Sequence, residues 1–309
     1  MLSRLKLSHL AAGAIVVLVG YTSSVAIIFQ AIEAVGATQA QANSWLVVLG
    51  LGMGLTSLIL SLWFRMPILT AWSTPGAALL ATSAAVEGGF ATAVAAFIIS
   101  ALMIILAGLW RPLGNAVARI PAPLANAMLA GVLLGLCLAP VKAVAEEPVS
   151  GLMIFVVWAL VARFRPLLAV PAAVAVALGL LILVIELPPI PISAIVPEPV
   201  FVMPAFSLAA LGLAVPLFIV TMASQNIPGI AVLNVNDYRP APGPLFTATG
   251  IFSLIGAPFG GHAVNLAAIT AALCAGRDAH PDPERRYWAA IVAGVFYILF
   301  GLFAGGATA

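Results

Sequence analysis

The residues best suited to chemistry lie in one short stretch, Gly256–Thr270. Three helix-breaking residues are followed by a polar pair: they are Pro258, Gly260 and Gly261, then His262 and Asn265. The Ala-rich run Leu266–Ala275 indicates a helix, and Asn is a preferred N-cap, so we expect Asn265 to begin a half-helix. Such a helix end carries free N–H donors and roughly half a positive charge, which suits an anion.

A second stretch, Pro67–Ala81, has the same design. Its extended part leads into a polar and helix-starting group, Ser73, Thr74, Pro75 and Gly76. Pro is favoured in the first turn of a helix, and Thr is a fair N-cap. When Pro67 is aligned with Pro258, Thr74 falls on Asn265, so the two predicted caps coincide.

Paired broken helices in corresponding halves of a chain point to the binding site of a transporter. We therefore expect an anion site built from backbone N–H groups near Ser73–Gly76 and Val264–Ala267. The alternative is that the breaks only allow helices to pack closely.

Other polar residues in apolar surroundings are further candidates. His262 is the ionisable side chain expected at mid-membrane, where it could carry a proton, help bind an anion, or hold broken backbone together. Gln225 and Asn226 are expected to end the eighth span, just before Pro228, and could face a substrate or satisfy the helix end. Glu33, expected just beyond the first span, is a secondary candidate for a proton relay.

The composition indicates a polytopic membrane protein. Of the 309 residues, 63% are hydrophobic and only 7% are charged, whereas a soluble domain carries about 25% charged residues. The predicted fold is all-α, with no soluble domain, no metal or cofactor, and no nucleic-acid partner, because the basic residues are scattered. The predicted spans are 9–31, 43–63, 67–85 (broken), 89–110, 121–140, 148–163, 166–186, 207–226, 245–257, 258–275 (broken) and 287–305.

The distribution of basic residues between the two sides of the membrane predicts the orientation of the chain. If the chain weaves through eleven spans, eleven of its twelve Lys and Arg residues fall on one side and only Lys142 on the other. The positive-inside rule then predicts a cytoplasmic N-terminus. Seven spans precede the Pro-rich external loop Leu187–Phe206, so a second copy of the first half would be inverted. This predicts a seven-plus-seven inverted repeat whose second half is truncated, with three expected spans missing.

Several motifs resemble one transporter family. The segments Leu7–Gly13 and Gly20–Gln30 look like the opening of benzoate/proton symporters, the BenE family. Thr221–Leu233 and Gly256–Thr270 resemble the family's most distinctive segments. The resemblance covers the whole chain and implies a carrier in the bacterial inner membrane that imports benzoate, or a similar aromatic monocarboxylate, together with protons. Tyr21, Trp72 and Phe259 are then candidates for the walls around the aromatic ring.

More distantly, the architecture is similar to that of uracil permeases. This analogy implies core segments at residues 1–110 and 207–309 and a gate segment at 111–206. Oligomeric state is left open, a homodimer included.

The sequence leaves three competing interpretations. A nucleobase or other anion carrier of the same architecture is disfavoured, because the eighth span has Gln225 and Asn226 where such permeases place an acid. An intramembrane enzyme is disfavoured, because a single mid-membrane His makes neither a triad nor a metal site. A truncated chain that does not transport is the third.

Overall fold

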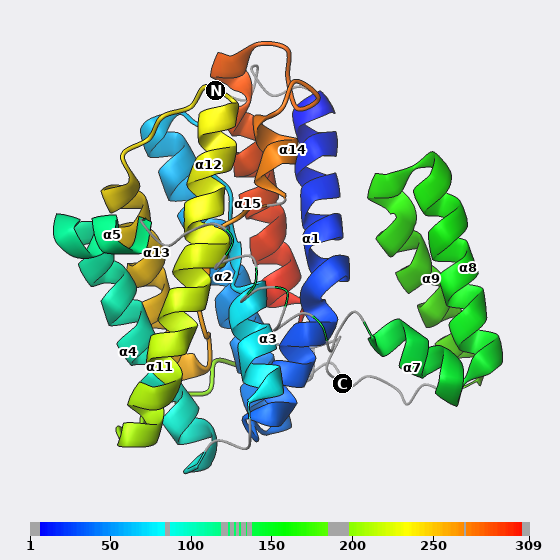
Figure 1. Ribbon diagram of the computed structural model, residues 1–309. Coiled ribbons are helices and arrows are strands. Elements are labelled where there is room, and N and C mark those ends of the chain that lie inside the picture. The colour runs from blue at the N-terminus through cyan, green and yellow to red at the C-terminus, as the bar shows by residue number, and fades with distance from the viewer. Residues whose placement is uncertain are drawn as a thin grey trace.

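The computed structural model describes residues 7–83, 87–118, 138–184, 198–268 and 270–304, together with four isolated positions between 119 and 137. Most of these residues form a bundle of roughly parallel and antiparallel helices (Figure 1). Within the described ranges, five helical segments are long and apolar enough to cross a membrane: Ser8–Ala34, Gln39–Phe64, Gly89–Leu109, Leu208–Val235 and Pro283–Leu302. The chain is therefore a helical membrane protein.

The helices follow the expected spans closely in most places. The elements are α1 (Leu7–Ala34), α2 (Gln39–Phe64), α3 (Thr74–Thr82), α4 (Gly89–Leu109), α5 (Arg111–Ala118), α7 (Ala139–Glu146), α8 (Pro148–Phe164), α9 (Pro166–Val184), α11 (Leu208–Thr221), α12 (Ile227–Val235), α13 (Pro242–Gly256), α14 (Ala271–Ala275) and α15 (Tyr287–Leu302). The span expected at 121–140 lies mostly outside the described residues.

Both predicted breaks are present. In each, the chain forms a three-residue strand before a short helix: β1 (Thr70–Trp72) leads into α3, and β2 (Val264–Leu266) precedes α14. A single-turn 3₁₀-helix, η3 (Ala257–Phe259), joins α13 to the second break. The strands pair antiparallel inside the bundle, with Ala71 opposite Asn265.

Glycines allow α2 and α15 to lie in direct backbone contact. A Cβ atom on Gly54 would come within 2.5 Å of the Gly294 carbonyl oxygen, and one on Gly50 would overlap the backbone of Gly301. Gly50 and Gly54 are four residues apart, so both lie on the same face of α2. This spacing of small residues is typical of close helix pairs in membranes.

Helices α7, α8 and α9 stand together beside α1, apart from the rest of the bundle (Figure 1). In α8, several large apolar side chains are exposed, among them Leu152, Phe155 and Leu160. Only the last part of the expected external loop is described, and it lies along the bundle. There Val202 N–H donates to the Pro258 carbonyl and Ala205 N–H to the Ala91 carbonyl, at 2.8 and 3.0 Å.

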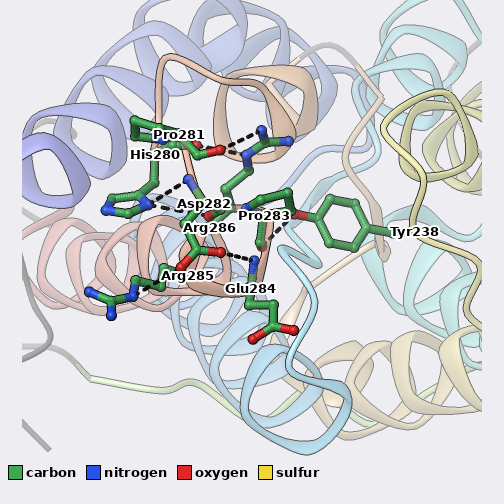
Figure 2. Close-up of polar contacts among 8 residues, drawn as sticks. All are labelled: Tyr238, His280, Pro281, Asp282, Pro283, Glu284, Arg285 and Arg286. Atoms are coloured by element: carbon green, nitrogen blue, oxygen red, sulfur yellow. Dashed lines mark hydrogen bonds and ion pairs between the residues drawn. The ribbon is translucent and has the colours of Figure 1, made fainter.

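A polar cap closes the end of the bundle between α14 and α15 (Figure 2). The buried guanidinium of Arg286 donates to the carbonyl oxygens of Ala275 and His280, each at 2.8 Å. Tyr238 donates its hydroxyl to the Pro283 carbonyl at 2.7 Å, and burial raises the pKa of that hydroxyl while Arg286 opposes the shift. The cap therefore anchors the C-terminal end of the short α14.

We expect Gly50→Leu to disrupt the α2–α15 contact. A larger side chain there has no room, because the opposing surface is backbone at Gly301. Overpacking of this kind costs about 1–3 kcal/mol or more, so the yield of folded protein and its melting temperature in detergent should both fall. Gly212→Leu in α11 is the matched control, since nothing lies within 4 Å of a Cβ at that position. An unchanged melting temperature for Gly50→Leu would contradict the packing argument.

Candidate functional site

The candidate site is the crossing of β1 and β2, where helical hydrogen bonding is interrupted inside the bundle. Serine hydroxyls from the preceding helices replace it. Ser57 of α2 accepts from Thr70 N–H at 2.9 Å, and Ser253 of α13 accepts from Val264 N–H at 2.8 Å. Backbone polar groups need such partners in a membrane because water is absent. Each strand is thus fastened to the helix before it.

Ser73 is the hub that connects the crossing to its neighbours. Its N–H donates to the Ala263 carbonyl at 3.1 Å, and its hydroxyl accepts from Gly76 N–H at 3.1 Å while bonding the Thr221 hydroxyl at 2.8 Å. A Cβ on Gly76 would lie 2.7 Å from this hydroxyl, so glycine leaves it the necessary space. Ser73 is therefore the N-cap of α3, and the expectation that Thr74 would be the cap is wrong; Thr74 is the first helical residue.

The second half-helix differs from the prediction. Asn265 lies in the middle of β2, and α14 begins only at Ala271 with Thr270 as its N-cap. The N–H groups expected to bind an anion here are already used: those of Val264, Leu266 and Ala267 donate to Ser253, Asn226 and Leu69. The prediction of a helix N-terminus at Asn265 was wrong because strand pairing takes up this segment.

His262 is fully enclosed and held by two partners. Its Nδ1 accepts from the indole N–H of Trp45 at 3.1 Å, and its Nε2 lies 2.9 Å from the Ser73 carbonyl oxygen. An indole N–H can only donate and a carbonyl can only accept, so the ring is neutral with its proton on Nε2. His262 therefore links α2, the end of β1 and the segment before β2.

Aromatic side chains cover the crossing on the side of α1. Tyr21 and Trp72 pack edge to face with ring centroids 4.6 Å apart, and both are buried. The Trp72 indole donates to Ser24 at 2.9 Å. Phe259, the third expected wall, packs instead against Phe201, with ring centroids 5.9 Å apart. The structure thus brings Tyr21 and Trp72 together and gives Phe259 a different neighbour.

The two glycines before His262 shape the approach to the crossing. Gly260 has a φ of +98°, a conformation that L side chains rarely adopt, and a Cβ on it would lie 3.2 Å from Trp45. A Cβ on Gly261 would lie 3.1 Å from Val48. Their role in the structure is to let this segment turn against α2.

The eighth span runs further than expected. Instead of ending at Gln225 and Asn226, the helix continues through Pro228 to Val235, with a π-turn, η2 (Met222–Asn226), in its middle. Asn226 accepts from Leu266 N–H at 2.9 Å, whereas Gln225 is half-buried in the same turn. Glu33 is exposed in the last turn of α1, not beyond it.

Three buried polar atoms near these elements lack a hydrogen-bond partner within the described part of the chain: the Tyr21 hydroxyl, the Ser224 hydroxyl and the Asn265 carbonyl oxygen. The Asn265 amide nitrogen is already bound to the Leu266 carbonyl at 2.8 Å, so its oxygen is fixed as an acceptor. Buried polar atoms usually have partners. These three are therefore the groups most able to bind a ligand.

The site offers neutral groups. Among the described residues that are buried, Arg286 in the cap is the one with a fixed charge; the others with polar side chains are hydroxyls, amides and histidines. No group of three or more metal-binding side chains was found in the same ranges. The arrangement can therefore hold a small ligand through hydroxyl, amide and backbone groups.

Several residues of the site were missed by the sequence analysis. Trp45, Ser57, Thr221 and Ser253 lie in regular, mostly apolar helices, where small polar residues commonly serve helix packing. One signal was available for the serines, since each lies in the helix just before a predicted break. No feature of the sequence indicates that Trp45 bonds to His262, because the two residues are 217 positions apart.

Comparison with known proteins identifies the family. A sequence model described as "Benzoate membrane transport protein", BenE, matches residues 3–309. The chain belongs to this family. It is 43% identical to the inner membrane protein YdcO of Escherichia coli K12, over 97% of this chain and 76% of the relative. It is 33% identical to a benzoate membrane transport protein of Acinetobacter baylyi, over 98% of this chain and 77% of the relative.

The fold is also that of a transporter. The transmembrane domain of the cyanobacterial bicarbonate transporter BicA aligns with a TM-score of 0.64, covering 100% of this chain and 84% of that domain, at 14% sequence identity. At this identity the likeness concerns the fold. The family match and the sequence relatives show that this BenE-family chain is a membrane transporter and not an enzyme.

We expect Trp45→Phe to destabilise the protein. Phe keeps the ring contacts with Phe90 and Phe97 but leaves His262 Nδ1 without its donor. A buried acceptor without a partner costs about 1–3 kcal/mol, so the melting temperature in detergent should fall by several degrees. Trp63→Phe is the control, because that side chain is 80% exposed. Equal melting temperatures for both variants would show that the Trp45–His262 bond contributes nothing.

Proposed function

We propose that this BenE-family chain imports benzoate, or a similar aromatic monocarboxylate, together with protons across the bacterial inner membrane, with its N-terminus in the cytoplasm. The observation that carries the proposal is the aromatic pair Tyr21 and Trp72 beside the capped N-terminus of α3. A planar ring fits against aromatic side chains, and a carboxylate is stabilised at the N-terminus of a helix. The name of the Acinetobacter relative supports the substrate class.

The neutral character of the site suits reversible binding of a carboxylate. A buried fixed cation would hold the anion by a strong charge interaction, whereas hydroxyl and backbone N–H donors allow release. The Tyr21 hydroxyl is one such donor. At the start of α3 the N–H groups of Ser73 and Gly76 are already bonded and Pro75 has none, so Thr74 N–H is the backbone donor that we propose faces the carboxylate.

Gln225, the Ser224 hydroxyl and Asn265 complete the set of side chains that we propose contact the substrate. Asn265 would donate through the second hydrogen of its amide nitrogen, because its free oxygen can only accept and a carboxylate offers no donor.

His262 is the proposed proton carrier. A second proton would have to enter at Nδ1, where the Trp45 indole now donates. Since an indole N–H cannot accept, protonation would break the contact between His262 and α2. Proton binding would in this way be linked to a rearrangement beside the substrate. Exposed Glu33 lies at the end of α1 and is the secondary candidate for a relay.

We expect Tyr21→Phe to weaken substrate binding without weakening the fold. The change removes a buried hydroxyl that has no partner within the described residues, so stability should be equal or higher. If the hydroxyl donates to the carboxylate, the apparent affinity should fall about tenfold, which corresponds to about 1.4 kcal/mol. Tyr238→Phe is the control, because it removes the bond to Pro283 in the cap and should lower stability alone. Unchanged affinity in Tyr21→Phe would remove this residue from the site.

Uptake of labelled benzoate by proteoliposomes with an inward proton gradient tests the proposal. Undissociated benzoic acid crosses lipid unaided, so protein-free liposomes, saturation by unlabelled benzoate and a neutral to alkaline pH range are needed as controls. We expect saturable uptake that stops when the gradient is collapsed. Competition by uracil or bicarbonate and not by benzoate would favour another anion carrier.

The same assay tests proton coupling. His262→Ala should lose the dependence of uptake on the gradient while benzoate binding is retained. Coupling that is unchanged in this variant would exclude His262 as the proton carrier.

A further inference from the structure

The helix Leu208–Val235 forms two side-chain hydrogen bonds to the strand crossing and the residue that follows it. Near one end of the strand pair, the Thr221 hydroxyl bonds the hydroxyl of Ser73, which directly follows β1. At the other end, Asn226 Oδ1 accepts from the N–H of Leu266, which lies opposite Thr70. Ser73 and Thr70 are three residues apart along an extended chain, which is about 10 Å. The two contacts therefore hold opposite ends of the crossing.

A regular α-helix could not make both contacts. Thr221 and Asn226 are five residues apart, and in an α-helix such residues point about 140° away from each other. The π-turn η2 brings the side chains of Thr221 and Asn226 back to the same face of the helix. Ile227 N–H bonds the carbonyl of Met222, five residues earlier, so residues five apart lie about one turn apart.

A proline directly follows the π-turn and is accommodated by it. Pro228 has no N–H and would clash with the carbonyl of the residue four positions earlier, Ser224, in a regular helix. Gly229 then brings the next turn against β2, since a Cβ there would lie 2.6 Å from the Leu266 side chain. The sequence Gln-Asn-Ile-Pro-Gly thus builds both the wide turn and the close contact that follows it.

The hydrogen bond from Leu266 N–H to Asn226 also affects the position of Asn265, whose Oδ1 is a buried acceptor without a partner in the described residues. Leu266 is held on both sides by side-chain amides, because Asn226 binds its N–H and Asn265 binds its carbonyl at 2.8 Å. Asn226 is in turn held by Met222, whose sulfur lies 3.1 Å from the Asn226 amide nitrogen. Fixing Leu266 fixes the neighbouring Asn265, whose Oδ1 has no partner in the described residues.

We propose that the π-turn makes this helix a two-point clamp on the strand crossing, and that Thr221 and Asn226 are positioning residues for the substrate site. Asn226 acts by holding Leu266, and through it Asn265, and its own amide does not contact the substrate. The part concerning the substrate rests on the proposed function; the clamp itself does not.

Two variants of the π-turn test the clamp without any substrate. Asn226→Leu keeps the size of the side chain and removes the acceptor, so hydrogen exchange of the peptide covering residues 260–268 should become faster. Asn236→Leu is the matched control, because Asn236 bonds only within its own helix, to the Val232 carbonyl. Unchanged exchange in Asn226→Leu would overturn the proposal.

Deletion of Ala223, combined with Pro228→Ala so that a regular helix meets no clash at Ser224, is the second test. It leaves Thr221 and the present Asn226 four residues apart, and residues at this spacing share one face of a regular helix. The variant should therefore fold and keep the protection of residues 260–268. Deletion of Ile219 from the regular part of α11 should abolish folding, because it turns Ala214 and Leu217 away from their neighbours by about 100°. If deleting Ala223 were as damaging as deleting Ile219, the clamp would be excluded.

Transport kinetics separate a positioning role from a structural one. In Asn226→Leu we expect the KM for benzoate to rise about tenfold, as for one lost hydrogen bond, with a maximal rate within about a factor of two. An unchanged KM with lower stability would reduce Asn226 to a structural residue. If the unmodified chain does not transport benzoate, the proposed function fails, while the exchange and deletion results still decide the clamp.

Discussion

The whole arrangement depends on supplying hydrogen bonds to extended backbone inside a membrane protein. A helix satisfies its own backbone groups, but β1 and β2 are only three residues long and each pairs with one neighbour. The remaining groups must find side chains, because lipid offers none. Ser57, Ser253, Asn226 and His262 provide them, and each comes from a different part of the chain. The crossing is thus a place where the backbone depends on side chains for its hydrogen bonds, and the proposed ligand would use the polar groups that remain without a partner.

This origin explains the chemistry of the site. Hydroxyls, amides and a neutral imidazole can support backbone without placing a charge in the bundle, and the same groups can hold a carboxylate without trapping it. His262 illustrates the overlap, because its two ring nitrogens are occupied by Trp45 and Ser73 in a way that allows one tautomer. Any proton that it accepts must disturb the support of the crossing. Under the proposed function, binding and protonation would therefore be coupled to the support of the backbone through the same few hydrogen bonds.

Local signals in the sequence were enough to predict the breaks, since Pro67, Pro258 and the following glycines interrupt apolar runs. They also predicted the long helices, the membrane location and the family. They failed where a contact between distant segments decided the outcome. Asn265 has the residue type of an N-cap, but pairing with β1 and the bond to Leu266 place it in a strand. Pro228 suggested the end of a helix, but a π-turn absorbs it and the helix continues. Trp45 could not be linked to His262 by any spacing rule.

The contact between α2 and α15 also limits how the protein can move. At Gly50, Gly54, Gly294 and Gly301 the backbones of the two helices are in direct contact, flanked by the side chains of Leu58 and Ile298. We expect two helices packed in this way to tilt or shift together as one rigid body and not to slide past one another. Both flank the site, since α2 carries Trp45 and Ser57, and α15 packs on α1 beside Tyr21. In a transport cycle the strand crossing would then move as a rigid body together with α2 and α15, and bending would occur in other parts of the chain.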